Sequence, residues 1–306
     1  MNFDNIDSML GTNRLIMSVC MPEDANSISA VYEAANMGFV SAVMVGNQDT
    51  INSLLKEQAP GYHPTIIHAS TPEEAAFKSV ELVREGKASA IMKGNISTPV
   101  LLKAVLNSET GIKASDTLCH VLAFELNNRL IFFSDGGMIP QPTLKDKIAI
   151  INNVKILAHN FGYKIPKIAV LSAYDTIVPD SQSSTDAAIL AKMWSRGMFG
   201  SDCVIDGPFA LDTALFQEVA YSKKVFSEVA GNADIIIAPE IDTGNIVGKS
   251  ILYYGNTRAG GMIIGAKVPV IMLSRADTTE LRINSIKLAL AAGNAASNNA
   301  KTHFRS

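Results

Sequence analysis

Short apolar runs alternate with longer amphipathic segments along the whole chain. This alternation is typical of repeated strand–helix units, in which the strands form a parallel-type sheet flanked by helices. The sequence therefore predicts an α/β fold. The runs that predict strands are residues 15–19, 41–46, 64–69, 88–94, 120–126, 129–134, 167–173, 202–206, 233–239, 261–266 and 268–274.

Helix starts and stops are marked in several of the intervening segments. Thr71 begins a capping box with proline at the first helical position, and Thr98 is also followed by proline. From Thr143 the apolar residues keep helical spacing until Gly162, a common residue at a helix end. A last helix is expected over 278–296.

The predicted strands at 120–126 and 129–134 are separated only by Asn127 and Asn128. Asparagine tolerates the positive φ values that a tight two-residue turn requires, so a hairpin is predicted here. A hairpin interrupts the strand–helix alternation, and the turn-rich residues 135–142 follow it. We therefore place a domain boundary just after the hairpin.

The length of the chain also bears on its division into domains. A chain of 306 residues is long for a single core, and its length alone predicts about two domains. We expect a first α/β domain over residues 1–139 and a second over residues 140–278. The last segment, residues 279–306, is expected to pack on the first domain.

Composition and charge narrow the class of protein. A hydrophobic content of 47% with 18% charged residues predicts a globular protein rather than a disordered one. A net charge of −3 gives no general attraction for nucleic acid or an anionic membrane, so neither is an expected partner. The cysteines, Cys20, Cys119 and Cys203, are few and widely spaced, which favours free thiols in a reducing compartment. Because the sequence shows no signal peptide and no apolar run of roughly 18 residues, we expect a soluble cytoplasmic protein.

Residues 92–99 join the end of a predicted strand to the start of a helix and contain Lys93, Gly94, Ser97 and Thr98. Free backbone amides and the positive end of the helix dipole can receive an anion there. The alternative is that the two hydroxyls only cap the helix and the lysine is only solvated. The P-loop pattern is absent, so a nucleoside triphosphate site is not supported.

Further polar loops follow other predicted strands. Ligands of parallel sheets bind at the carboxyl ends of the strands, so these loops together predict a binding cleft. The alternative is that they are structural turns that need glycine. The loop over 173–188 is expected to close at Ser183, Ser184 and Asp186, which resemble caps of the next helix. The candidate substrate-binding residues are Asp135, Gly136 and Gly137 in 132–142, Asp206 in 204–212, and Asn245 in 238–245.

Metal and hydrolase sites are poorly supported. Asp202 and Asp206 have a D-x-x-x-D spacing, and Glu240 and Asp242 add carboxylates, but no histidine pair or oxygen cage accompanies them. Asp202 is expected to begin its strand and Asp206 to end it, so structural turns are favoured over a metal site. The histidines show no HExxH or Ser/His/Asp order, which argues against a hydrolase triad.

Residues 269–280 contain an apolar strand that ends abruptly at Ser274, Arg275 and Asp277. A guanidinium at a strand end can bind a phosphate oxygen in bidentate fashion, and the serine hydroxyl can donate to a developing oxyanion. The alternative is an ion pair between Arg275 and Asp277 that closes a surface turn.

Several segments, taken together, resemble the phosphate acetyltransferase and phosphate butyryltransferase family, in family order over residues 88–290. The likeness is closer to the butyryl branch, because the SRAD sequence is followed by NSI. The resemblance implies two α/β domains with a cleft between them, a fold also found in isocitrate and isopropylmalate dehydrogenases. The segments are residues 92–111, 132–138, 186–197, 204–212, 229–245 and 269–290.

The resemblance also implies a reaction, in which an acyl-CoA and phosphate are in equilibrium with an acyl phosphate and CoA. No metal, no permanently bound cofactor and no covalent enzyme intermediate are required. CoA or acyl-CoA and phosphate are the implied substrates, and at least a homodimer is expected.

The family motif assigns roles to particular residues. Ser274 and Arg275 match its Ser-Arg pair, which we assign to phosphate and the polarised carbonyl. An acid of the acetyl branch, a candidate base for the CoA thiol, corresponds here to Leu281, so Asp277 or Glu280 would have to replace it.

Other positions depart from the family pattern. Lys103 stands where the family has an arginine, which keeps the charge but loses the planar fork. Lys113, Cys119 and residues 178–185 also differ from the expected motifs. These departures motivate one alternative, a non-enzymatic sensor of CoA or acyl phosphate. A second alternative is a metal-dependent NAD dehydrogenase on the same fold.

Overall fold

The structure is a computed structural model that describes residues 1–10, 14–274 and 276–303. Contacts divide the chain into two compact units. Unit 1 comprises Met1–Asn2 and Thr117–Thr257, and unit 2 comprises Phe3–Asp116 and Arg258–Ser306. Each unit is an α/β structure, so the predicted fold class is confirmed.

Unit 2 contains a sheet with the strand order β3-β2-β1-β4-β11-β10. All of these strands are parallel except β10, which runs antiparallel to β11. The strand order therefore reverses direction at β1, with β2 on one side and β4 on the other. The strands are β1 (Leu15–Cys20), β2 (Val40–Gly46), β3 (Thr65–His68), β4 (Ala90–Lys93), β10 (Ala259–Ile264) and β11 (Val270–Met272).

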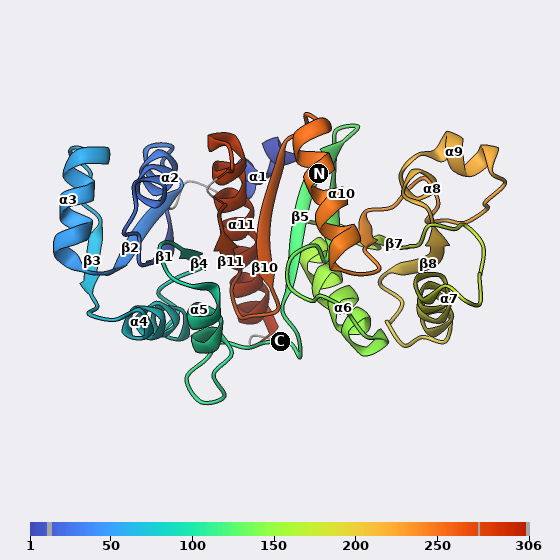
Figure 1. The fold of residues 1–306 in the computed structure, drawn as a ribbon, viewed down its shortest axis with the longest axis horizontal. Helices are drawn as coiled ribbons and strands as arrows, with labels where there is room; N and C mark the ends of the chain where they lie inside the picture. The colour runs from blue at the N-terminus through green and yellow to red at the C-terminus, as the bar shows by residue number, and fades with distance from the viewer. Residues whose placement is uncertain (11–13, 275, 304–306) are drawn as a thin grey trace. The chain divides into compact units, whose positions relative to one another are not determined.

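The helices of unit 2 pack on this sheet. Helices α4 and α5 pack against each other, and α11 packs against α1 and α2. Figure 1 shows α4 and α5 below the strands of unit 2 and α2 above them. The helices are α1 (Phe3–Leu10), α2 (Ala25–Asn36), α3 (Gln48–Gln58), α4 (Pro72–Arg84), α5 (Thr98–Val105) and α11 (Thr279–His303).

Unit 1 contains strands in the order β5-β6-β9-β7-β8. The predicted hairpin is present as β5 and β6, with Asn127 at φ 51° and Asn128 at φ 60°. The remaining pairs in this order are parallel. The strands are β5 (Cys119–Leu126), β6 (Arg129–Ser134), β7 (Lys167–Leu171), β8 (Val204–Phe209) and β9 (Ile235–Ile237), and the helices are α6 (Leu144–Asn160), α7 (Gln182–Ser195), α8 (Leu211–Leu215), α9 (Gln217–Ser222) and α10 (Ile241–Tyr254).

The units do not end where the sequence placed the domain boundaries. We expected divisions at residues 139/140 and 278/279, whereas the contacts divide the chain at 116/117 and 257/258. The first difference arises because β6 pairs with β9, which ties the hairpin to unit 1. The second arises because β11 pairs with β4, which ties the strands before α11 to unit 2.

All predicted strands are present, with ends shifted by a few residues. The predicted cap at Thr71 is confirmed, although the Glu74 carboxylate accepts the N–H of Ser70 rather than that of Thr71. The start expected at Thr98 differs, because the N-cap of α5 is Ser97, which makes no side-chain capping bond. The hydroxyl of Thr71 accepts the backbone N–H of Glu74 at 3.2 Å. Thr143 and Asp146 form a reciprocal capping box at the start of α6. Local chemistry that satisfies the first amides of a helix therefore fixes these starts.

The predicted loop over 173–188 is wrong at its end, because α7 already begins at Gln182. Ser183, Ser184 and Asp186 lie inside the helix instead of capping it. The Ser184 hydroxyl accepts the N–H of Val178 at 2.8 Å and donates to the carbonyl of Thr176, so it ties the loop to the helix.

Asp186 meets Lys147 of α6 at 2.7 Å, and both side chains are buried, at 6% and 3% exposed. A buried ion pair of this kind is costly to break from one side, because removal of one partner leaves an uncompensated charge. The pair therefore holds α6 and α7 in place within unit 1.

The expected placement of the D-x-x-x-D carboxylates also needs correction. Asp202 lies before β8, where it accepts hydrogen bonds from Lys155 at 2.9 Å and from His159 at 3.0 Å. Asp206 lies inside β8 rather than at its end. Within the described part of the chain, no cluster of three His, Cys, Asp or Glu side chains has the geometry to hold a metal ion.

Among the described helices, none combines the length and apolar character needed to cross a membrane.

Candidate functional site

A cavity of about 360 Å³ lies at the carboxyl ends of β1, β4 and β11 in unit 2. The loops that follow these three strands and the first turns of α2 and α11 supply its lining. In an open parallel sheet, a crevice forms where the strand order reverses, and here that position is between β1 and β4. Strand topology therefore predicts a binding site at this cavity.

The hydrogen-bonded register brings the three strand ends together. Cys20 of β1 is paired with Lys93 of β4, and Lys93 is paired with Met272 of β11. Ser274 follows two residues after Met272 and lines the cavity with Lys93 and Gly94. Residues predicted separately from distant segments are therefore brought together at one edge of the sheet.

Gly94 allows the loop after β4 to lie directly against the loop after β1. Its N–H donates to the carbonyl of Cys20 at 2.8 Å, and the N–H of Asn95 donates to the carbonyl of Met21 at 2.6 Å. A Cβ added at Gly94 would lie 2.2 Å from the Met21 carbonyl oxygen. The close approach of the two backbones thus explains the glycine that the sequence singled out.

Of the described residues, the two cations that line the cavity come from different elements, β4 and α11. Lys93 ends β4, and its Nζ lies 3.3 Å from the carbonyl oxygen of Gly94. Arg282 comes from the first turns of α11 and lines the same cavity. Both side chains are half-buried, so their charges are less screened than those of a solvated lysine or arginine.

The acid of the cavity lining is Asp24, the N-cap of α2. Its Oδ1 accepts the N–H of Ser27 at 2.9 Å, and its Oδ2 accepts the hydroxyl of Ser27 at 2.6 Å. Because the carboxylate is engaged at the positive end of α2, part of its charge is offset. The positive charges of Lys93 and Arg282 therefore outweigh that of Asp24, and the electrostatic potential of the cavity favours an anion.

The turn after β11 is held by Asp277. Its Oδ2 accepts the N–H of Ser274 at 2.7 Å, and the Ser274 hydroxyl accepts the N–H of Ala276 at 3.3 Å. Arg275, the predicted phosphate ligand, lies outside the described residues. The structure therefore places Ser274 and Asp277 in one turn and places the serine at the cavity.

The start of α5 borders the same strand ends. Ser97 is its N-cap and makes no side-chain capping bond, and the hydroxyl of Thr98 points to the sulfur of Met272 at 3.9 Å. The interpretation of these hydroxyls as ordinary helix caps is therefore not confirmed for Ser97. The first amides of α5 have no cap from this side chain.

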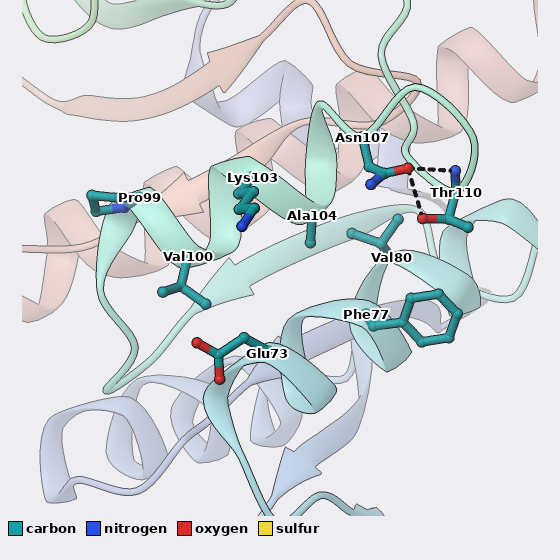
Figure 2. Close-up of a pocket in the computed structure, with 9 residues that line it drawn as sticks. All are labelled: Glu73, Phe77, Val80, Pro99, Val100, Lys103, Ala104, Asn107 and Thr110. Atoms are coloured by element: carbon teal, nitrogen blue, oxygen red, sulfur yellow. Dashed lines mark hydrogen bonds between the residues drawn. The ribbon is translucent and has the colours of Figure 1, made fainter.

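Lys103 lies in a different cavity, of about 410 Å³, between α4 and α5 of unit 2. Figure 2 shows Val100, Lys103 and Ala104 on the side of α5 that faces Phe77 and Val80 of α4. The lining is mainly apolar and carries the charged side chains Lys103 of α5 and Glu73 of α4. This groove suits a ligand part that presents an apolar surface to the wall and a negative charge to Lys103, at the side away from Glu73.

In unit 1 the structure brings four of the predicted residues together around one turn. Asp135 is 3% exposed and accepts backbone N–H groups from Gly137 at 2.9 Å and Ile139 at 2.9 Å, and also from His120 and Met138. Asn245 donates from Nδ2 to the carbonyl of Gly136 at 3.3 Å. The carboxylate of Asp135 therefore stabilises the turn through its hydrogen bonds to backbone amides.

Asp206 is not part of this group. Its Oδ1 accepts the N–H of Gly207 at 2.8 Å, and it lines neither of the two cavities described. A local role in β8 accounts for the contacts that it makes.

Sequence reasoning missed Asp24, Ser27, Asn95 and Arg282 as cavity residues. The first two follow the strand at 15–19 and begin a helix, which is the signal that identified residues 92–99. Arg282 gave no such signal, because it sits inside a helix and reaches the cavity only through the packing of α11.

The thiol of Cys20, at the end of β1, lies next to the cavity, and its burial determines its protonation state. Burial raises the pKa of Cys20 at the end of β1 to about 11. A thiol with that pKa is protonated at neutral pH and is a poor nucleophile. The site therefore offers cations, amides and hydroxyls rather than an activated cysteine.

Comparison with known proteins identifies relatives over nearly the whole chain. The family model described as "Phosphate acetyl/butaryl transferase" matches residues 48–290. A phosphate butyryltransferase of Clostridium acetobutylicum is 42% identical over 282 residues, which is 91% of this chain and 93% of the relative. A phosphate acetyltransferase of Thermotoga maritima is 35% identical, over 89% of this chain and 93% of the relative.

Solved structures agree with these sequence relatives. A branched-chain phosphotransacylase from Enterococcus faecalis has a TM-score of 0.82 and 30% identity, covering 91% of this chain and 99% of that chain. A 4-hydroxythreonine-4-phosphate dehydrogenase from Klebsiella pneumoniae has a TM-score of 0.55 and 14% identity, covering 92% of this chain and 100% of that chain. The second similarity shows a shared fold alone.

Replacement of Gly94 by alanine is expected to lower the free energy of unfolding by about 1–3 kcal/mol, because the added Cβ meets backbone that cannot move aside cheaply. Chemical denaturation measures this. The matched control is Gly248→Ala in α10, where the added Cβ would have Leu122 Cδ2 as its nearest neighbour, at 3.6 Å. A Gly94→Ala protein as stable as the control would contradict the close approach of the two loops.

Proposed function

The chain belongs to the phosphate acetyltransferase and phosphate butyryltransferase family, and we propose that it reversibly transfers a short or medium acyl group between CoA and inorganic phosphate. Greater identity to a butyryltransferase relative than to an acetyltransferase relative, 42% against 35%, favours the butyryl branch. The observation that carries the proposal is the meeting of Lys93, Ser274 and three strand ends around one cation-bearing cavity.

The proposed reaction needs hydrogen-bond donors that stabilise negative charge. It does not need a nucleophilic side chain, because phosphate itself is the nucleophile. A phosphate oxygen attacks the thioester carbonyl carbon, the carbon–sulfur bond then breaks, and the CoA sulfur leaves and takes up a proton. The intermediate is a tetrahedral oxyanion, which fixed hydrogen-bond donors and cations stabilise. We assign Ser274 and Arg275 to the oxyanion and the phosphate, with Lys93, Gly94 and the amides near Ser97 and Thr98 as further phosphate contacts.

In the reverse direction, a base must take the proton of the CoA thiol. We propose Asp277 for this role, because it lies in the same turn as Ser274 and stands near the position where the family acid is replaced by Leu281. Glu280 is the weaker candidate, since its side chain is 67% exposed and lies 4.0 Å from Arg258.

We propose that Lys103 and the groove between α4 and α5 bind another part of the acyl-CoA. The groove begins at Pro99, directly after the start of α5 that borders the reaction cavity. The lysine would bind a phosphate of the CoA, and the apolar wall would cover an uncharged part.

Unit 1 offers a second group of candidate substrate contacts. We propose that the backbone of Gly136 and Gly137 approaches substrate, that Asp135 fixes their turn, and that Asn245 supports it from α10. Asp206 remains a proposal from the sequence. Its hydrogen bond to Gly207 neither supports nor requires contact with substrate.

We further propose a cytoplasmic homodimer or larger homo-oligomer that needs no resident cofactor. The described cysteines are free and buried, which suits a reducing compartment. The acyl transfer involves no change of redox state, so no redox cofactor enters it.

The exposed surface of α10 supports the proposed homo-oligomer. Its side chains Ile246, Tyr253 and Tyr254 are 66%, 62% and 89% exposed, as expected of a face that another copy covers.

The alternatives are less well supported. A metal-dependent dehydrogenase of this fold would need a carboxylate cluster, yet Asp202, the first carboxylate of the D-x-x-x-D pattern, is held by Lys155 and His159. A binding protein without activity would release no CoA from an acyl-CoA in the presence of phosphate.

The purified protein is expected to release CoA from an acyl-CoA only when inorganic phosphate is present, with a maximum at butyryl or a branched short chain. A thiol-reactive dye measures release across a series of acyl lengths. Treatment with a chelator should leave the rate unchanged, because no step uses a metal. Absence of release at every chain length would favour the sensor, and loss on chelation would favour the dehydrogenase.

Arg275→Ala is expected to lower kcat/KM by about 100-fold or more, as loss of a charge-assisted donor to a transition-state oxyanion does. Steady-state kinetics of phosphate-dependent CoA release measures this effect. Arg84→Ala, at the exposed end of α4, is the matched control and should retain the wild-type rate. Near-normal turnover in Arg275→Ala would overturn the assigned role.

Asp277→Asn is expected to lower the rate of the CoA-consuming direction near neutral pH and to remove the rise of rate with pH. The asparagine oxygen can still accept the N–H of Ser274, so the turn is preserved while the base is lost. The pH–rate profiles of wild type, Asp277→Asn and Glu280→Gln are compared. A profile of Asp277→Asn that keeps the wild-type shape would exclude this residue as the base.

A further inference from the structure

We propose that Arg282 is a substrate-binding residue that holds the phosphate group of inorganic phosphate and of the acyl phosphate product. The inference rests on the proposed function and extends its site by a cation that the family motif around Ser274 does not include. It begins from the lining of the 360 Å³ cavity, to which Arg282 contributes together with Lys93 and Ser274.

The backbone places Arg282 at this position. Thr278 caps the start of α11 by accepting the N–H of Leu281 at 3.2 Å, and the N–H of Arg282 donates to the carbonyl of Thr278 at 3.1 Å. Helix α11 is also tied to β10, because the hydroxyl of Ser285 accepts the N–H of Gly261 at 2.9 Å. The guanidinium therefore extends from a fixed helix start, which favours a defined geometry at the cavity.

The charge at this position conflicts with its helix. The N-terminus of a helix carries partial positive charge, so acids are stabilising there and cations are not. Arg282 is the fourth residue of α11, at the end of its first turn and therefore near the positive end of the dipole. A local rule broken in this way, at a residue that lines a cavity, is typical of a functional site.

The charge of phosphate matches the positive groups of the cavity. The chain as a whole has a net charge of −3, so an anion must be held by local groups. Lys93 alone contributes one point charge, and Asp24 contributes an opposite charge that the start of α2 partly offsets. A guanidinium adds a second positive charge and a planar pair of donors that match two phosphate oxygens.

The test compares Arg282→Gln, which removes the charge and keeps much of the length, with Arg282→Lys and with the control Arg84→Ala. Arg282→Gln is expected to raise the KM for phosphate about 10-fold or more and to leave the KM for acyl-CoA within about 2-fold, since hydrogen bonds to charged groups have this strength. In the reverse direction, the KM for acyl phosphate should rise and that for CoA should not. Arg282→Lys should lie between wild type and Arg282→Gln.

A binding measurement without turnover separates this inference from the proposed function. Inorganic phosphate alone is added to each protein, and its effect on Tm is measured. Wild type and Arg84→Ala should gain stability with phosphate, and Arg282→Gln should lose most of this gain. If wild type binds phosphate in this way but transfers no acyl group, the proposed function fails while the phosphate site stands.

Other results would overturn the role of Arg282. An unchanged KM for phosphate with an unchanged phosphate-dependent Tm in Arg282→Gln excludes it as a ligand. An equal rise of every KM, with a lower Tm in the absence of phosphate, shows a structural role. If Arg282→Gln does not fold, the same criteria apply to Arg282→Lys.

Discussion

The hydrogen-bonded register of β1, β4 and β11 is the constraint on which the candidate site depends. Parallel pairing fixes Cys20, Lys93 and Met272 side by side, so the three loops that follow begin at the same edge of the sheet. These strands are buried, and a slip of one residue would turn their apolar side chains away from the core. Core packing, rather than any contact with a ligand, therefore sets the spacing of the groups that are proposed to bind phosphate.

An acidic chain can build an anion site on this frame because the helices begin where the strands end. Helices α2, α5 and α11 all start after these strands, and their N-termini carry partial positive charge. The acid that lines the cavity, Asp24, is engaged with Ser27. Lys93 and Arg282 then add full charges where the backbone already favours an anion. The positive field is thus local and does not need a basic protein.

The sequence predicted most of the fold, because buried strands appear as short apolar runs and the turn at Asn127 and Asn128 has a specific backbone requirement. It failed where tertiary contacts decide the outcome, as at the start of α7. For the site, strand-end position identified Lys93 and Ser274, which the structure brings together. Sequence could not show that the carboxylate of Asp135 turns inward to backbone amides, or that Arg282 reaches the cavity from within a helix.

The composition of the cavity also argues for direct transfer between the two substrates. Cys20 at its edge is kept protonated by burial, with a pKa raised to about 11, so it is unsuited to carry an acyl group. Apart from Asp24 and Leu273, the described groups that line the cavity can donate hydrogen bonds or carry positive charge, and these stabilise an oxyanion without becoming covalently modified. Since catalysis requires stronger interaction in the transition state than with either substrate, rigid attachment of these donors to strand ends and helix starts is the feature that the fold contributes.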